Sequence, residues 1–204
     1  LYSKSDLIIT GSGQLNINAN YNNGITGKDT LQIASALISV KSANHGINGK
    51  DSLTIQNSQI SVSSGGDALR STNDSDTSAG FISITDSKLE LTAGEDGIQA
   101  ETSITVHGGQ CSINAGGGSN QKISSDASAK GIKAGTDIQI DSGEYSLDCS
   151  DDAIHANGNV TISGGIYTVL SGDDGIHANQ NASISDGTVT VNKSYEGIEG
   201  AVIT

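Results

Sequence analysis

The chain has 204 residues, including 27 glycines, and it lacks proline, tryptophan and methionine. Its formal net charge of −13 argues against a nucleic-acid partner, because binding to phosphates requires lysine and arginine side chains. No stretch has the length and apolarity of a transmembrane helix, and the start without methionine or signal peptide indicates a processed piece of a longer precursor.

A small residue followed by an aliphatic one recurs along the chain at a nearly constant spacing. The pairs begin at Gly24, Gly46, Ala68, Gly97, Gly131, Ala153, Gly175 and Gly197. The intervals are 22 residues except for two, of 29 and 34 residues, which predict loop insertions near residues 71–80 and 116–130. We expect both loops to overhang the same side. A fixed period of this length is typical of a solenoid, so residues 1–204 are expected to form a single domain.

Each period contains short segments in which apolar residues alternate with polar ones, as in a strand. In chain order, the predicted strands lie at 24–26, 31–33, 38–40, 46–48, 53–55, 60–62, 68–70, 82–84, 89–91, 97–99, 104–106, 131–133, 138–140, 145–147, 153–155, 160–162, 167–169, 175–177, 182–184, 189–191 and 197–199. Turns rich in Gly, Asn, Asp and Ser separate them.

These elements predict an all-β, single-stranded parallel β-helix of about eight coils, each of 22 residues. Neighbouring coils would lie about 4.8 Å apart, and right-handed winding is the default for parallel crossovers. Tyr145 and Tyr167 share an inward column and are expected to stack in the core. Cys111 and Cys149 fall at different positions of the repeat, so we expect two buried thiols rather than a disulfide.

Carboxylates precede most of the small-aliphatic pairs. The doubled acids are Glu95 and Asp96, Asp151 and Asp152, and Asp173 and Asp174. Stacked like charges repel by roughly 1 kcal/mol per pair in water, and a hard divalent cation would offset this. Calcium takes 6–8 oxygen ligands, so these six carboxylates are predicted metal ligands, with Asp151/Asp152 and Asp173/Asp174 as the best site. Ordinary turn chemistry, in which Asp accepts a backbone N–H, is the alternative. No Cys/His set has zinc spacing.

The residue two positions after each small residue should face outward, beside the carboxylates. This row includes Arg70, Lys133, His155 and His177, which are candidate contacts for a substrate, although exposed histidines with only hydrogen-bonding roles are the plainer interpretation. Tyr195, like Tyr21, lies beside a Gly-Ile turn and is a candidate for an exposed sugar contact.

The segments SGDDGIHAN (171–179), CSDDAIHAN (149–157), AGEDGIQA and SYEGIEG resemble those of a family of secreted bacterial carbohydrate-binding proteins. That resemblance covers about Gly24 to Gly200. It implies a right-handed, pectate-lyase-like β-helix that binds cellulose and acidic plant polysaccharides such as polygalacturonate without catalysis. It also implies calcium ions held by the six carboxylates named above. We therefore expect a secreted or cell-surface monomer.

Two other functions remain open. A calcium-dependent pectate lyase would need a base, for which Arg70 and Lys133 are the candidates on the outward row. A structural stalk or adhesin segment would use calcium only to join neighbouring coils. Because β-helices host lyases, hydrolases, adhesins and binding proteins, the fold does not choose among these functions.

Overall fold

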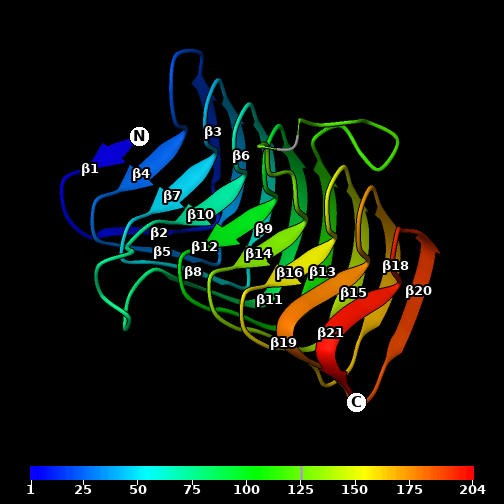
Figure 1. Ribbon diagram of the computed structural model, residues 1–204. Coiled ribbons are helices and arrows are strands. Elements are labelled where there is room, and N and C mark those ends of the chain that lie inside the picture. Colours follow the sequence, from blue (N-terminus) through cyan, green and yellow to red (C-terminus); the bar gives the residue numbers. More distant parts are fainter. Residues whose placement is uncertain (125) are drawn as a thin grey trace.

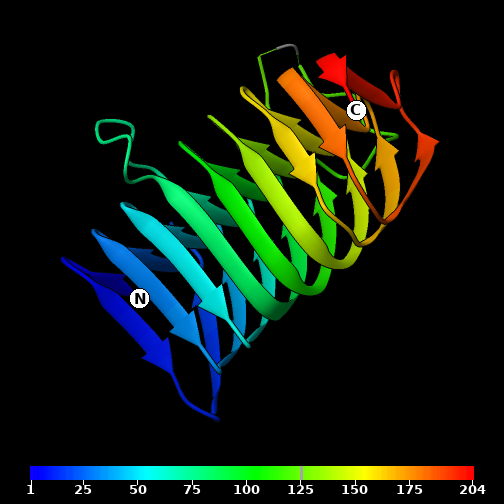
Figure 2. The ribbon, with the colours of Figure 1, turned by 90° about the horizontal axis from the view of Figure 1, so that it is seen from below.

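The rod-shaped chain is built from strands that stack in parallel from one turn to the next. A computed structural model describes residues 1–124 and 126–204, and these residues form strands and loops without any helix, and hence without a helix able to cross a membrane. Figures 1 and 2 show the strands following one another around a β-solenoid. The all-β parallel architecture is thus confirmed, with about nine turns. The turn beyond the predicted eight is residues 1–23, which begins without a Gly-Ile pair, and its Tyr2 pairs with Thr26.

The strands form three faces of the rod, and each face has one strand segment per turn. Face 1 contains β1 (Tyr2–Ser3), β4 (Ile25–Gly27), β7 (Ile47–Gly49), β10 (Leu69–Ser71), β12 (Ile98–Ala100), β14 (Ile132–Ala134), β16 (Ile154–Ala156) and the starts of β19 (Ile176–Ile184) and β21 (Ile198–Ile203). Face 2 contains β2 (Leu7–Thr10), β5 (Thr30–Ala34), β8 (Ser52–Gln56), β17 (Val160–Ile162), the starts of β11 (Phe81–Ala93), β13 (Ile104–Ala115) and β15 (Ile138–Cys149), and the ends of β19 and β21. Face 3 contains β3 (Gln14–Ala19), β6 (Leu37–Ser42), β9 (Gln59–Ser64), β18 (Ile166–Ser171), β20 (Thr188–Lys193) and the ends of β11, β13 and β15.

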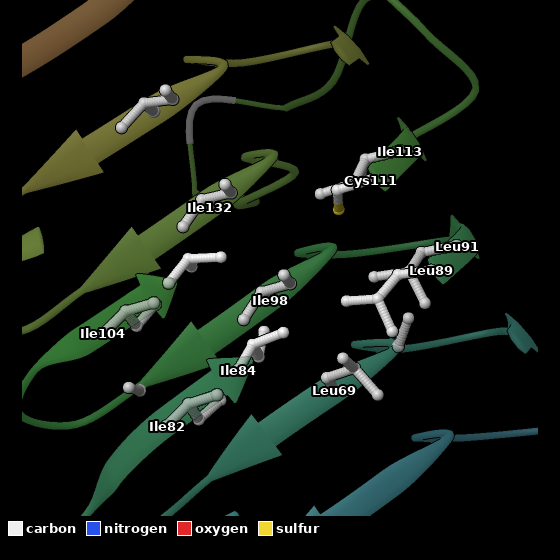
Figure 3. Packing of buried hydrophobic residues seen from close by; sticks show 14 of the residues in the cluster. Leu69, Ile82, Ile84, Leu89, Leu91, Ile98, Ile104, Cys111, Ile113 and Ile132 are labelled. Atoms are coloured by element: carbon white, nitrogen blue, oxygen red, sulfur yellow. The ribbon is translucent and has the colours of Figure 1, made fainter. Parts of the chain in front are cut away.

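The core consists of columns of aliphatic side chains that repeat from turn to turn. Figure 3 shows part of it, where Leu69, Ile98 and Ile132 of face 1 lie in one column. All three side chains are buried, and burial of each contributes about 1.5–3 kcal/mol. The predicted tyrosine stack is confirmed: the rings of Tyr145 and Tyr167 lie 4.7 Å apart at an interplanar angle of 5°. Both predicted free cysteines are buried.

The small residue that begins each repeat lies where the backbone of one turn meets that of the next. A Cβ atom added at Gly46 would lie 2.4 Å from the carbonyl oxygen of Ala68. At Gly131 it would lie 2.4 Å from the carbonyl oxygen of Ala153. The close approach of the turns explains why glycine occupies this column in most turns, and Ala68 and Ala153, both fully buried, are the largest residues found in it.

The corner between faces 2 and 3 uses a left-handed backbone. Ser35, Asn57 and Asp86 have φ angles of 51°, 46° and 43° there. In later turns, glycines with positive φ take this corner, among them Gly143 and Gly165. Glycine tolerates this conformation best, and Asn and Asp tolerate it better than Ser.

The two insertions leave the rod at opposite edges of face 1, so the expectation that they overhang the same side is wrong. Insertion 71–80 follows β10 and is anchored where Asn73 Nδ2 donates to Asp51 Oδ1 at 2.7 Å. Insertion 116–130 precedes β14, at the other edge in Figure 1. Because the strands of face 1 are parallel, their starts and their ends lie along different edges.

Candidate functional site

A row of aspartates lies at the edge where the chain enters face 1. In each doubled acid the second member points inward: Asp96, Asp152 and Asp174 are at most 3% exposed, whereas Glu95 and Asp173 are exposed. Asp67 occupies the same position of its turn and is also buried. We call Asp67, Asp96, Asp152 and Asp174 the buried aspartate row.

Each member of the buried aspartate row uses one oxygen to bind the backbone of the following turn. Asp67 Oδ1 accepts the backbone N–H of Asp96 at 3.1 Å, and Asp96 Oδ1 accepts that of Lys130 at 2.8 Å. Asp152 Oδ1 accepts the N–H of Asp174 at 2.9 Å, and Asp174 Oδ1 accepts that of Glu196 at 3.0 Å. The turn-chemistry alternative raised from the sequence is thus correct in kind for these four residues. The bonds join neighbouring turns rather than closing a local turn, so they tie the solenoid together along this edge.

The second oxygen of each buried aspartate contacts a basic side chain. Asp67 Oδ2 lies 3.3 Å from Arg70 Nη1, and Asp96 Oδ2 lies 3.1 Å from Lys133 Nζ. Asp152 Oδ2 lies 2.8 Å from His155 Nδ1, and Asp174 Oδ2 lies 3.1 Å from His177 Nδ1. These bases belong to the predicted outward row. These side chains are partly buried rather than fully exposed, because they lie against the carboxylates. The arrangement offsets the like-charge repulsion within the protein itself.

Lys130 places an ammonium group between two carboxylates. Its Nζ lies 2.7 Å from Asp151 Oδ1 and 2.7 Å from Asp152 Oδ2. Burial alone would raise the pKa of Asp152, but hydrogen bonds from His155 and Lys130 outweigh it and hold that pKa well below its usual range. Burial and repulsion from Asp152, Asp174 and Asp151 raise the pKa of Asp173.

The predicted metal ligands form clusters that differ from the pairs in the sequence. Ligand atoms of Asp151, Asp152 and Asp173 lie within 4.8 Å of one another, and those of Glu95 lie equally close to His45 and Asp67. Asp96 instead accepts hydrogen bonds from Ser128, Lys130 and Lys133. Asp174 lies with His177 and Glu199.

The second insertion creates a cleft on each of its sides, and Ile123, Ala127 and Ser128 line both clefts. The first cleft, of about 390 Å³, is also lined by Asp67, Arg70, Glu95, Asp96, Gln99, Asp126, Ala129 and Lys133, with Gly94. The second, of about 530 Å³, contains Lys130, Asp151 and Asp173. Part of the row of carboxylates and part of the outward row therefore line clefts next to this loop.

The first cleft brings together Arg70 and Lys133, which are far apart in the sequence. They flank Gln99 on three consecutive strands, in the register Arg70, Gln99, Lys133. Among the described residues, Asn48 Oδ1, Arg70 Nε and Gln99 Oε1 are buried without a hydrogen-bond partner. Of these three residues, Arg70 and Gln99 line the first cleft and Asn48 does not.

The other predicted contacts lie elsewhere. His155 and His177 lie one turn apart, with ring centroids 4.7 Å from each other and ring planes tilted by 44°. Tyr195 is 80% exposed, and its backbone N–H donates to Asp173 O. Sequence reasoning missed Lys130, Gln99 and His45. Lys130 and His45 could have been found from the sequence. Each directly precedes the small residue of its repeat, the position that an aspartate occupies in other repeats.

Comparison with known proteins gives one family and one relative. A protein-family model described as "Carbohydrate-binding domain-containing protein" matches residues 1–175. A carbohydrate-binding domain-containing protein of Acetivibrio thermocellus is 42% identical over 117 residues, which are 57% of this chain and 41% of that protein. The aligned part thus spans about two-fifths of that relative's length. No solved structure matches the chain.

Proposed function

The chain belongs to the carbohydrate-binding domain family, and from this premise we propose that it is a non-catalytic protein that binds cellulose or acidic plant polysaccharides such as polygalacturonate. The observation that carries the proposal is the first cleft, where Arg70, Gln99 and Lys133 line consecutive turns. Turns repeat about every 4.8 Å, so an extended sugar chain lying along the rod meets a polar side chain at every turn.

The chemistry of the first cleft suits sugars with carboxylates and hydroxyls. Arg70 and Lys133 supply cationic donors, which can pair with uronate groups. Arg70 Nε and Gln99 Oε1 are buried without partners, and a small rotation of either side chain toward the cleft would offer a donor or an acceptor to a sugar hydroxyl. Leaving such buried atoms without partners costs about 1–3 kcal/mol each, so a ligand that satisfies them gains affinity.

We further propose that calcium strengthens binding to acidic polysaccharides. Asp151, Asp152 and Asp173 supply clustered oxygen ligands beside the second cleft, and the first cleft contains Glu95 and Asp96. Calcium at the first group would share Asp151 and Asp152 with the Lys130 ammonium, so we expect modest affinity. A bound cation could also bridge uronate carboxylates. This function implies a secreted or cell-surface location.

Calorimetric titration with polygalacturonate, with calcium and after chelation, tests the proposal, together with sedimentation on insoluble cellulose. We expect binding that calcium strengthens, and about tenfold weaker binding for Arg70→Ala or Lys133→Ala, equivalent to ~1.4 kcal/mol. Lys88→Ala is the matched control, because Lys88 forms an exposed ion pair with Glu90 on face 3.

Two outcomes would overturn the proposal. Formation of unsaturated product from polygalacturonate would indicate a pectate lyase and direct attention to Arg70 and Lys133 as bases. Absence of binding to either polysaccharide, while calcium still raises the melting temperature, would favour a structural stalk.

A further inference from the structure

His155 and His177 use their ring nitrogens in the same way. They are register partners on β16 and β19. Nε2 of His155 lies 3.2 Å from Asn157 Oδ1, and Nε2 of His177 lies 3.0 Å from Asn179 Oδ1. With the amide oxygens facing the rings, Nε2 is the donor in both residues, because an amide oxygen only accepts hydrogen bonds.

The other ring nitrogen, Nδ1, points toward carboxylates in both residues. His155 Nδ1 lies 2.8 Å from Asp152 Oδ2. His177 Nδ1 lies 3.1 Å from Asp174 Oδ2 and 4.0 Å from Asp152 Oδ2. A neutral ring with its proton on Nε2 has a bare lone pair at Nδ1, which repels a carboxylate. A cation at Nδ1, either an added proton or a metal ion, makes such a contact favourable.

We propose that Asp152, His155 and His177 form a binding site for a first-row transition-metal ion of the Zn²⁺ type, independent of polysaccharide binding. Their ligand atoms lie within 4.8 Å of one another. In a tetrahedral zinc site with bonds of about 2.0–2.1 Å, neighbouring ligand atoms lie about 3.4 Å apart. The two distances from Asp152 Oδ2 to the histidine nitrogens, 2.8 and 4.0 Å, lie on either side of that value.

The donor set distinguishes this site from the proposed calcium sites. Two imidazole nitrogens favour Zn²⁺ and its transition-metal neighbours, whereas calcium prefers oxygen ligands alone. The side chains of His155 and His177 are only 14% and 23% exposed, and that of Asp152 is 3% exposed, so the donors are held against the rod.

Outer contacts orient all three ligands. Asn157 and Asn179 hold the two rings through Nε2, as partners of metal-binding histidines commonly do. Asp152 Oδ1 accepts the backbone N–H of Asp174 at 2.9 Å, and Oδ2 faces the histidines and also the Lys130 ammonium 2.7 Å away, with which a bound metal ion would share that oxygen. Glu199 Oε2 lies 3.2 Å from His177 Nδ1 and adds negative charge that favours a divalent cation.

Titration of the protein with zinc alone tests the proposal. We expect one zinc ion per chain at this site, displaced little by excess calcium, and affinity lowered more than about 100-fold by His155→Gln or His177→Gln. Asn157→Ala, which leaves every ligand in place, should lower the affinity about tenfold. His107→Gln is the matched control. His107 belongs to a different part of the chain, where its Nδ1 lies 2.5 Å from Asp141 Oδ2.

Measurements on the wild-type chain avoid any effect of the variants on folding. Zinc should shift the Nδ1 resonances of His155 and His177 in imidazole ¹⁵N spectra and leave those of His107 unchanged, and cobalt should give the intense visible bands of a tetrahedral site. Absence of zinc binding, unchanged His155 and His177 resonances, or full displacement by calcium would overturn the inference. None of these results depends on binding to a polysaccharide.

Discussion

Replacing Lys130 by methionine tests how the stacked carboxylates are stabilised. Methionine keeps most of the apolar stem but removes the ammonium that lies 2.7 Å from both Asp151 and Asp152. The side chain of Asp152 is 3% exposed, so its charge would stay buried without its main cation. Breaking a buried pair in this way costs about 3 kcal/mol, which lowers the melting temperature of a chain of this size by about 6–12 °C.

Thermal unfolding followed by circular dichroism, with urea titration alongside, measures the effect. Lys88→Met is the control: the Lys88–Glu90 pair is about half exposed on both sides, so its loss should cost less than about 1 kcal/mol. The double variant Lys130→Met/Asp152→Asn should recover part of the stability, because no uncompensated charge remains on Asp152. Calcium should raise the melting temperature of Lys130→Met more than that of the wild type, since the ammonium no longer competes for the same oxygens. The reasoning is refuted if Lys130→Met changes the melting temperature as little as Lys88→Met does.

Three further predictions concern the backbone and the core. Ser35→Gly should stabilise the chain by about 0.5–1 kcal/mol in urea titrations, because φ is 51° at this corner, and a destabilised variant would contradict this. Tyr167→Phe should cost about 0.5–1.5 kcal/mol, through loss of the hydrogen bond from its hydroxyl to Gly164 O at 2.9 Å, whereas Tyr167→Ala should cost about 3–5 kcal/mol by leaving a cavity. Burial raises the pKa of Cys111 from 9.0 to about 12, so the native thiol should resist alkylation in mild alkali. As the pH rises above about 9, the thiol ionises in the unfolded chain before it does in the native chain. The contribution of Cys111 to the free energy of unfolding should therefore fall between that pH and about 12. Rapid labelling of the native protein would contradict the burial of this thiol.

The arrangement of the strands could be predicted from the sequence because the same local pattern recurs turn after turn. Alternation between apolar and polar residues defines each strand, and the 22-residue interval sets which residues stack. The inward position of Tyr145 and Tyr167 follows from that periodicity alone. The first turn escaped the prediction because residues 1–23 begin without the Gly-Ile pair that marks the other turns.

The chemistry along the carboxylate edge required the tertiary structure, because its contacts join residues a whole turn apart through side chains of variable reach. The sequence could not show which acid of each pair is buried, or that Lys130 extends between Asp151 and Asp152. The path of the second insertion decides which polar residues share a cleft, as Arg70 and Lys133 do. The sequence contains no set of Cys and His residues with zinc-site spacing. The ring centroids of His155 and His177 nevertheless lie 4.7 Å apart, because residues one 22-residue period apart stack on adjacent strands of the solenoid.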